Sequence, residues 1–260
     1  MKKLLGIIAV AMLMVVGAQA QVILNQNFNS FTNGNLVGQG TWVQTGTTAT
    51  SPVQVAGGAV GPTVQGSAQD VSISLSSPVT SGSFYYGVDF SFTSKNASSD
   101  YFLHIANTNA GTGFSSRLYA QSSGLGFALA WGGSSTAPTA FGAELAFNTT
   151  YRAVMRYDIV SGLANDTGAL YITTGAFDSV EANNTTYQNV TTWAFGTEQT
   201  AFGAFNIRQG TNTGVYTIDN VLVGTTFASA AIPEPSTYAL LGLGLGALWI
   251  LRRKKPAAKA

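Results

Sequence analysis

The sequence contains no cysteine and a single histidine, and only 9% of its residues are charged. Without cysteine the chain has no disulfide framework and no thiolate metal site. One histidine is too few for an imidazole-based zinc site, and no Gly-x-Ser-x-Gly segment supplies the nucleophile elbow of a serine hydrolase. We therefore expect His104 to be a structural residue, on the face of its strand that also carries Phe102 and Ala106.

The N-terminus has the composition of a secretory signal. Two lysines precede an apolar run over residues 4–16, and small residues follow it, with Ala18 and Ala20 in the positions that signal peptidase reads. A run this short is a poor permanent transmembrane helix, which needs about 20 apolar residues. We predict that residues 1–20 are a signal peptide, removed by signal peptidase after Ala20.

The C-terminus holds a second apolar segment, over residues 238–251, between a proline-containing tripeptide and a basic cluster. The tripeptide is Pro233, Glu234 and Pro235, and the cluster is Arg252, Arg253, Lys254 and Lys255. The prolines keep the helix from extending upstream, and the cluster should stay in the cytoplasm. We predict a linker over 229–237, a membrane-spanning helix over 238–251 and a cytoplasmic tail over 252–260. A plain single-span anchor is the alternative.

The part of the chain between these ends is acidic. Residues 21–232 carry five basic and ten acidic side chains, a net charge of −5, whereas the whole chain has a formal net charge of +1. We therefore do not expect nucleic acid to be a partner. The length suffices to bury a core without disulfide bonds.

This middle part is rich in Gly, Ser, Thr and Asn, and its hydrophobic residues alternate with polar ones. The alternation is clearest over residues 84–92, which predicts a strand with one buried face. Further strands are expected over residues 71–75, 101–107, 115–120, 125–131, 151–159, 168–174, 201–208 and 215–224. We predict an all-β domain over residues 21–228, a two-sheet antiparallel β-sandwich with no helix of its own.

The C-terminal combination of tripeptide, glycine-rich apolar segment and basic cluster resembles the PEP-CTERM sorting signal. Exosortases recognise and cut that signal in Gram-negative bacteria that make extracellular polymers. The resemblance implies that Pro233, Glu234 and Pro235 form the recognition tripeptide and that an exosortase-type protease is a partner. It also implies an inner-membrane intermediate, followed by release to the cell surface or extracellular matrix.

The order of the strands resembles that of concanavalin A-like, laminin-G-like jelly rolls. The segments that carry this resemblance are residues 28–42 near the start and residues 216–224 near the end, with central strands at 101–105, 126–130 and 151–157. The first and last strands pair in that family. The resemblance therefore implies that residues 22–28 lie beside residues 216–223.

Jelly rolls of this kind include glycoside hydrolases, which place two carboxylic acids on either side of a sugar bond. No two acidic residues are spaced at i and i+2 in this sequence, as one cleft-lining strand would require. The closest pair, Asp178 and Glu181, lies in an expected loop. A hydrolase therefore needs acids that are distant in sequence, such as Glu144, Asp158 and Glu198.

Two loops offer oxygen atoms to a calcium ion, one at Asp166 and one at Asp219 and Asn220. The donors are few, so we favour turn and sheet-end hydrogen bonds and expect no cofactor. Aromatic side chains suited to stacking on sugars are Trp42, Trp131, Trp193, Tyr119 and Tyr187, and each is also suited to a sandwich core.

These observations favour an exported, non-enzymatic protein of the cell surface or matrix, with a structural or glycan-adhesive role and extracellular polysaccharide as its partner. The alternatives are a polysaccharide-active hydrolase and a membrane-anchored protein that keeps its tail.

Overall fold

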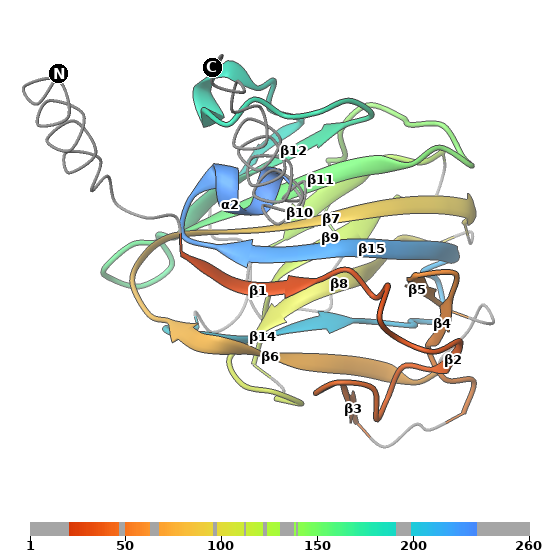
Figure 1. Ribbon diagram of the computed structural model, residues 1–260. Helices are drawn as coiled ribbons and strands as arrows, with labels where there is room; N and C mark the ends of the chain where they lie inside the picture. The colour runs from red at the N-terminus through yellow and green to blue at the C-terminus, as the bar shows by residue number, and fades with distance from the viewer. Residues whose placement is uncertain are drawn as a thin grey trace, which may run out of the picture.

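The computed structural model describes residues 21–46, 50–62, 68–95, 98–111, 113–121, 124–130, 138, 140–190 and 199–232. Within these ranges two antiparallel sheets pack face to face (Figure 1), which confirms the predicted β-sandwich. The expected signal peptide and the chain from residue 233 onward lie outside the described residues. No helix in the described ranges is long and apolar enough to cross a membrane.

The first sheet has nine strands and contains both ends of the domain. Its order is β13 (Gln188–Val190), β12 (Thr167–Thr173), β11 (Tyr151–Ile159), β7 (Gly82–Ser94), β15 (Val215–Gly224), β5 (Ala59–Gly61), β4 (Gln54–Ala56) and β2 (Gly34–Asn35), with β1 (Val22–Gln26) also paired to β15. The pairing of β1 with β15 confirms that the first and last strands lie side by side.

The second sheet has six strands. Its order is β10 (Phe127–Ala130), β9 (Phe114–Ala120), β8 (Asp100–Ala106), β14 (Phe202–Ile207), β6 (Asp70–Val79) and β3 (Val43–Thr45). All the strands of four or more residues fall where they were expected, β1 from the jelly-roll resemblance and the others from their own sequence patterns. The strands that were not predicted, β2 to β5 and β13, have two or three residues each, too few to show a period.

The core lies between the two sheets and is aromatic. Phe84, Phe90 and Phe92 on β7 are at most 1% exposed, and Phe92 meets Phe102 of β8 edge to face at 5.0 Å between ring centroids. Each fully buried ring of this kind stabilises the fold by about 2–3 kcal/mol relative to exposure. Apolar packing therefore holds the two sheets together without disulfide bonds.

A short helix, α2 (Phe227–Ala231), covers the outer face of the nine-stranded sheet and was not predicted. Thr226 and Ser229 form its capping box, and Phe227 packs edge to face against Tyr85 and Phe177. Five residues are too few to show a helical period. Because Ala230 and Ala231 are buried, the domain continues beyond the expected boundary at residue 228.

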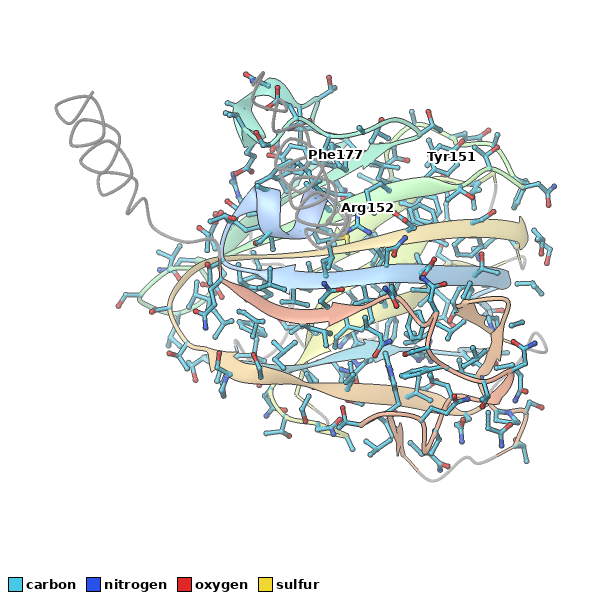
Figure 2. The ribbon with its side chains drawn as sticks, viewed as in Figure 1. Tyr151, Arg152 and Phe177 are labelled. Carbon is cyan, nitrogen blue, oxygen red and sulfur yellow. The ribbon has the colours of Figure 1, made fainter. Side chains whose placement is uncertain are left out.

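Arg152 of β11 fixes the end of this helix (Figure 2). Its guanidinium is 6% exposed, lies 3.1 Å from Asp89, and donates to the carbonyl oxygens of Asn220 and Ala230. Gly87 is required at the contact, because a Cβ there would lie 2.0 Å from the Ala230 oxygen. The buried guanidinium is therefore held by one carboxylate and by two carbonyl oxygens, one from β15 and one from α2. A cavity of about 320 Å³ lies beside Arg152.

Candidate functional site

The outer face of the six-stranded sheet carries an unusual concentration of polar side chains around β8, β9 and β14. We call it the polar face, and it consists of Asp70, Asp100, Tyr101, His104, Arg117, Tyr119, Asn206 and Arg208. The aromatic neighbours Phe102 and Phe205 point the other way, into the core. Strand pairing places Tyr101 of β8 opposite Tyr119 of β9, which we call the first row, and His104 of β8 opposite Asn206 of β14, the second row.

The position of His104 differs from the sequence-based expectation. Strict alternation would put it on the face of Phe102, yet Phe102 contacts core rings while His104 contacts Tyr101 at 5.5 Å between ring centroids. The pairing of β8 with β9 shifts register between Tyr101 and Leu103. A bulge of this kind adds one residue and reverses the side-chain order beyond it, which places Tyr101 and His104 on one face.

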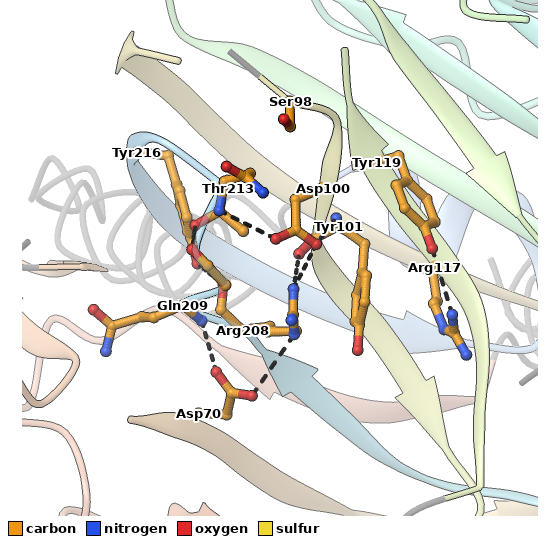
Figure 3. A network of polar contacts seen from close by, with 12 residues as sticks. Asp70, Ser98, Asp100, Tyr101, Arg117, Tyr119, Arg208, Gln209, Thr213 and Tyr216 are labelled. Carbon is orange, nitrogen blue, oxygen red and sulfur yellow. Dashed lines mark hydrogen bonds and ion pairs between the residues drawn. The ribbon is translucent and has the colours of Figure 1, made fainter. Parts of the chain in front are cut away.

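Arg208 organises the first row of the polar face (Figure 3). Its Nη1 donates to Asp100 at 2.6 Å, its Nε lies 3.9 Å from Asp70, and its Cζ is 4.2 Å from the centroid of the Tyr101 ring. The backbone N–H of Gln209 donates to Asp70 at 2.7 Å. Burial raises the pKa of Asp70 to about 6, although the Gln209 hydrogen bond and Arg208 oppose the shift.

Arg117 holds the neighbouring strand to the same ring. Its Cζ lies 4.9 Å from the Tyr101 centroid, and its Nη1 donates to the Tyr119 hydroxyl at 3.4 Å. Two guanidinium groups are thus within cation–π distance of one tyrosine. Because both guanidinium groups pack against the Tyr101 ring, that ring is not free to stack on a ligand. A ligand at this row would therefore be held by hydrogen bonds.

The second row holds buried polar groups that lack partners. His104 is 2% exposed and Asn206 is 0% exposed. Neither ring nitrogen of His104 and neither amide atom of Asn206 has a hydrogen-bond partner among the described residues. Burial, with Arg117 and Arg208 nearby, lowers the pKa of His104 to about 3, so the imidazole is neutral and offers one donor and one acceptor.

The loop between β8 and β9 folds back toward this second row. The backbone N–H of Ala110 donates to Ser72 Oγ at 3.3 Å, and Ser72 pairs in register with Asn206. The Oδ1 atoms of Asn107 and Asn109 in this loop are also buried without a partner among the described residues. Buried polar atoms are normally hydrogen-bonded, so a group of unpaired ones indicates bound water or a ligand.

The acids considered for a hydrolase do not form a pair in the described part of the chain. Asp158 on the nine-stranded sheet accepts from Arg156 at 3.1 Å and from Thr167 at 3.0 Å. Glu144 lies against Gly124, near β10 of the other sheet, so the fold does not bring these two acids together. Glu198 lies outside the described residues.

Asp178 and Glu181, the pair of acids that is closest in sequence, form hydrogen bonds within the fold. Glu181 accepts from Arg156 at 2.8 Å and from the hydroxyls of Tyr85 and Tyr171. Asp178 accepts from the backbone N–H of Val180 at 2.7 Å. These contacts tie the segment after β12 to the outer face of the nine-stranded sheet.

The acids in the two loops considered for calcium accept hydrogen bonds from the protein, although those of Asp166 are not the turn bonds that were expected. Asp166 accepts from the backbone N–H of Val160 at 2.7 Å and from the Tyr157 hydroxyl at 2.5 Å. Asp219 accepts from the backbone N–H of Asn220 at 2.7 Å. In the described ranges no group of three or more His, Cys, Asp or Glu side chains is placed to hold a metal ion.

The aromatic candidates for a sugar-stacking platform do not form one where the structure describes them. Trp42 and Tyr119 are each 1% exposed. The hydroxyl of Tyr187 bonds to backbone groups of Phe127 and Ala143. Trp131 and Trp193 lie outside the described residues.

The sorting residues lie outside the described residues, and sequence comparison addresses those at the C-terminus. The PEP-CTERM protein-sorting motif matches residues 231–255, which include Pro233, Glu234, Pro235 and the basic cluster. The chain therefore carries this motif, as its sequence predicted. The signal-peptidase site at Ala18 and Ala20 stays a prediction.

Solved structures resemble this chain at low sequence identity. The globular domain of T. cruzi calreticulin has a TM-score of 0.48 at 8% identity and covers 90% of this chain and 100% of its own. Trypanosoma rangeli sialidase has a TM-score of 0.45 at 10% identity, covering 70% of this chain and 28% of the sialidase. The carbohydrate-binding module CBM66 from Bacillus subtilis has a TM-score of 0.41 at 12% identity, with 74% and 99% covered. No curated protein matches the sequence.

Proposed function

We propose that this protein is a non-enzymatic adhesive component of the cell surface or extracellular matrix, binding polysaccharide through the polar face. The sorting motif implies export and sorting to the surface, with processing by an exosortase. The observation that carries the adhesive role is the row of buried, unpaired polar groups at His104 and Asn206. Removal of the signal peptide and tail would leave this sandwich as the mature protein.

The chemistry of this row is complementary to sugar hydroxyl groups. A hydroxyl group both donates and accepts hydrogen bonds. The neutral imidazole of His104 and the amide of Asn206 likewise each carry a donor and an acceptor. The strands that carry them are held in register, so the two side chains have a fixed spacing. A rigid hydrogen-bonding floor reduces the entropy that binding costs.

The geometry of the nearby acids supports binding rather than hydrolysis. Asp70 and Asp100 share the polar face, but both interact with the guanidinium of Arg208 between them. A glycosidase needs its two carboxyl groups on either side of the sugar bond, about 5–10 Å apart, with one free to protonate the leaving group. A sugar bond at this place would have to displace Arg208.

The export pathway is tested by the intact mass of the protein recovered from the envelope and medium of producing cells. Loss of residues 1–20 together with truncation near Pro233 to Pro235 is the expected result. A mass that retains residues 238–260 would show a membrane-anchored protein instead. A reducing-sugar assay on the same preparation tests the non-enzymatic assignment, and release of sugar from the producer's polysaccharide would refute it.

A further inference from the structure

The cavity beside Arg152 has apolar walls and one polar atom without a partner. Tyr151, Phe177, Ala231 and Ile232 are among the residues that line it. The Nε atom of Arg152 is buried and has no hydrogen-bond partner among the described residues, although both Nη atoms are bonded. A buried donor without an acceptor costs free energy, so an occupant that brings an acceptor is favoured.

The sorting motif begins on the wall of this cavity. The motif matches from residue 231 onward, and Ala231 is 3% exposed. Ile232 follows in an extended conformation, with φ −112° and ψ 103°, and Pro233 is the next residue. Three extended residues span at most about 10–11 Å. The recognition tripeptide therefore starts at the cavity and stays within about that distance of its wall.

The tripeptide suits this cavity chemically. A residue that precedes proline is biased toward extended backbone, which applies to Ile232 and to Glu234. Alternate side chains of an extended segment point to opposite sides, so both proline rings can face the aromatic wall while Glu234 faces solvent, away from the carboxylate of Asp89. Proline has no N–H, so a buried proline segment brings carbonyl acceptors for Arg152 and no donor that would be left unpaired.

We propose that the cavity beside Arg152 is an intramolecular docking site for the sorting tripeptide. Both prolines pack on its apolar walls, and a carbonyl oxygen of the tripeptide accepts from Arg152 Nε. The docked and the undocked tripeptide are two states, and a protease that binds the undocked state competes with docking. This competition rests on the proposed processing by an exosortase, whereas docking itself depends on neither that processing nor the polar face.

Docking is tested by NMR relaxation of backbone amides in a fragment of residues 21–237, which holds both hydrophobic clusters and the complete tripeptide. Glu234 is the reporter, because the other two residues of the tripeptide have no backbone N–H. We expect its order parameter to exceed about 0.6 and to approach about 0.85, the value of rigid backbone. A value of about 0.6 or below, that of a flexible chain, would overturn the proposal.

A matched pair of variants assigns the ordering to the cavity. Ala176 lines the cavity and is exposed, so Ala176→Trp places an indole there without changing the core. Ala182 is exposed on the nearby 3-10 helix Glu181–Asn183 and is not among the lining residues, so Ala182→Trp is the control. Glu234 should become flexible in Ala176→Trp and stay ordered in Ala182→Trp. Equal order in both variants would overturn the cavity as the docking site.

The competition with processing is tested on the full chain in producing cells. Full-length Ala176→Trp should lose its tail faster than wild type and Ala182→Trp, measured as the ratio of intact to truncated mass at successive times after synthesis. Equal or slower loss would overturn the competition. Absence of truncation in all three proteins would instead refute the proposed processing. Neither experiment uses polysaccharide, so both outcomes are separable from the adhesive function.

Discussion

Replacing Asn206 by leucine should make the unliganded domain more stable. Asn206 is fully buried on β14, and its Oδ1 and Nδ2 have no partner among the described residues. Each unpaired buried polar group costs about 1–3 kcal/mol, whereas an apolar side chain of the same shape does not carry that cost. Proteins ordinarily lose stability on core substitution, so a gain here would be a distinctive result.

The expected gain is about 1–3 kcal/mol, because leucine has the branched outline of asparagine without its polar atoms, and the loop at Ala110 still covers it. In a domain of this size 1 kcal/mol shifts the melting temperature by about 2–4 °C. A fragment of residues 21–232 contains every residue of both hydrophobic clusters, from Ile23 to Ala231. Its urea unfolding, followed by far-ultraviolet circular dichroism, measures the change at constant m-value. Ser74→Ala, at an exposed position of β6, is the control and should unfold as wild type.

A loss of more than about 1 kcal/mol in Asn206→Leu, with m unchanged, would refute this reasoning. It would mean that the amide is hydrogen-bonded in the free protein. The binding site would then have no unpaired floor at this position. His104→Phe provides an independent check, because its ring packing is preserved and only its nitrogens are lost.

Three further predictions concern the rest of the domain. The pKa of Asp70 is raised to about 6, so ionising this carboxyl group disfavours the folded state. The free energy of unfolding of wild type should therefore fall by on the order of 1–3 kcal/mol as pH rises from 4 to 7, whereas that of Asp70→Asn should not. Parallel pH profiles of the two proteins in urea unfolding would contradict this. Arg152→Ala should cost about 3–5 kcal/mol in thermal unfolding, because it leaves Asp89 without its counter-ion and the Ala230 carbonyl without its donor. A loss below about 1 kcal/mol would show that the pair contributes little. Gly87→Ala should displace α2, since its Cβ would meet the Ala230 oxygen, and so speed limited proteolysis after Gly224; unchanged cleavage would show that the helix adapts.

The sequence predicted the strands that have enough residues to show a period. The alternation over residues 84–92 identified β7 and its buried face, and the buried rings follow from it. Strands of two or three residues and the five-residue helix α2 carry no such signal. Their positions depend on tertiary contacts, such as the close approach of the Ala230 carbonyl to Gly87.

The polar face was less predictable than the fold. Sequence reasoning placed residues 101–107 on a strand but assigned His104 to the wrong face, because one bulge after Tyr101 reverses the alternation. Asp70, Asn206 and Arg208 were not singled out at all, since their neighbourhood depends on the order of β6, β14 and β8 in the sheet. One available signal was an amide residue between two hydrophobic neighbours, as at Asn206 between Phe205 and Ile207.

The adhesive role is tested most directly by cosedimentation of the 21–232 fragment with the insoluble extracellular polysaccharide of the producing organism. The proposed function predicts saturable binding that both Asn206→Leu and His104→Phe weaken about tenfold, while Ser74→Ala binds as wild type. No cosedimentation, or equal binding by all four proteins, would contradict the assignment of the polar face as the adhesive site.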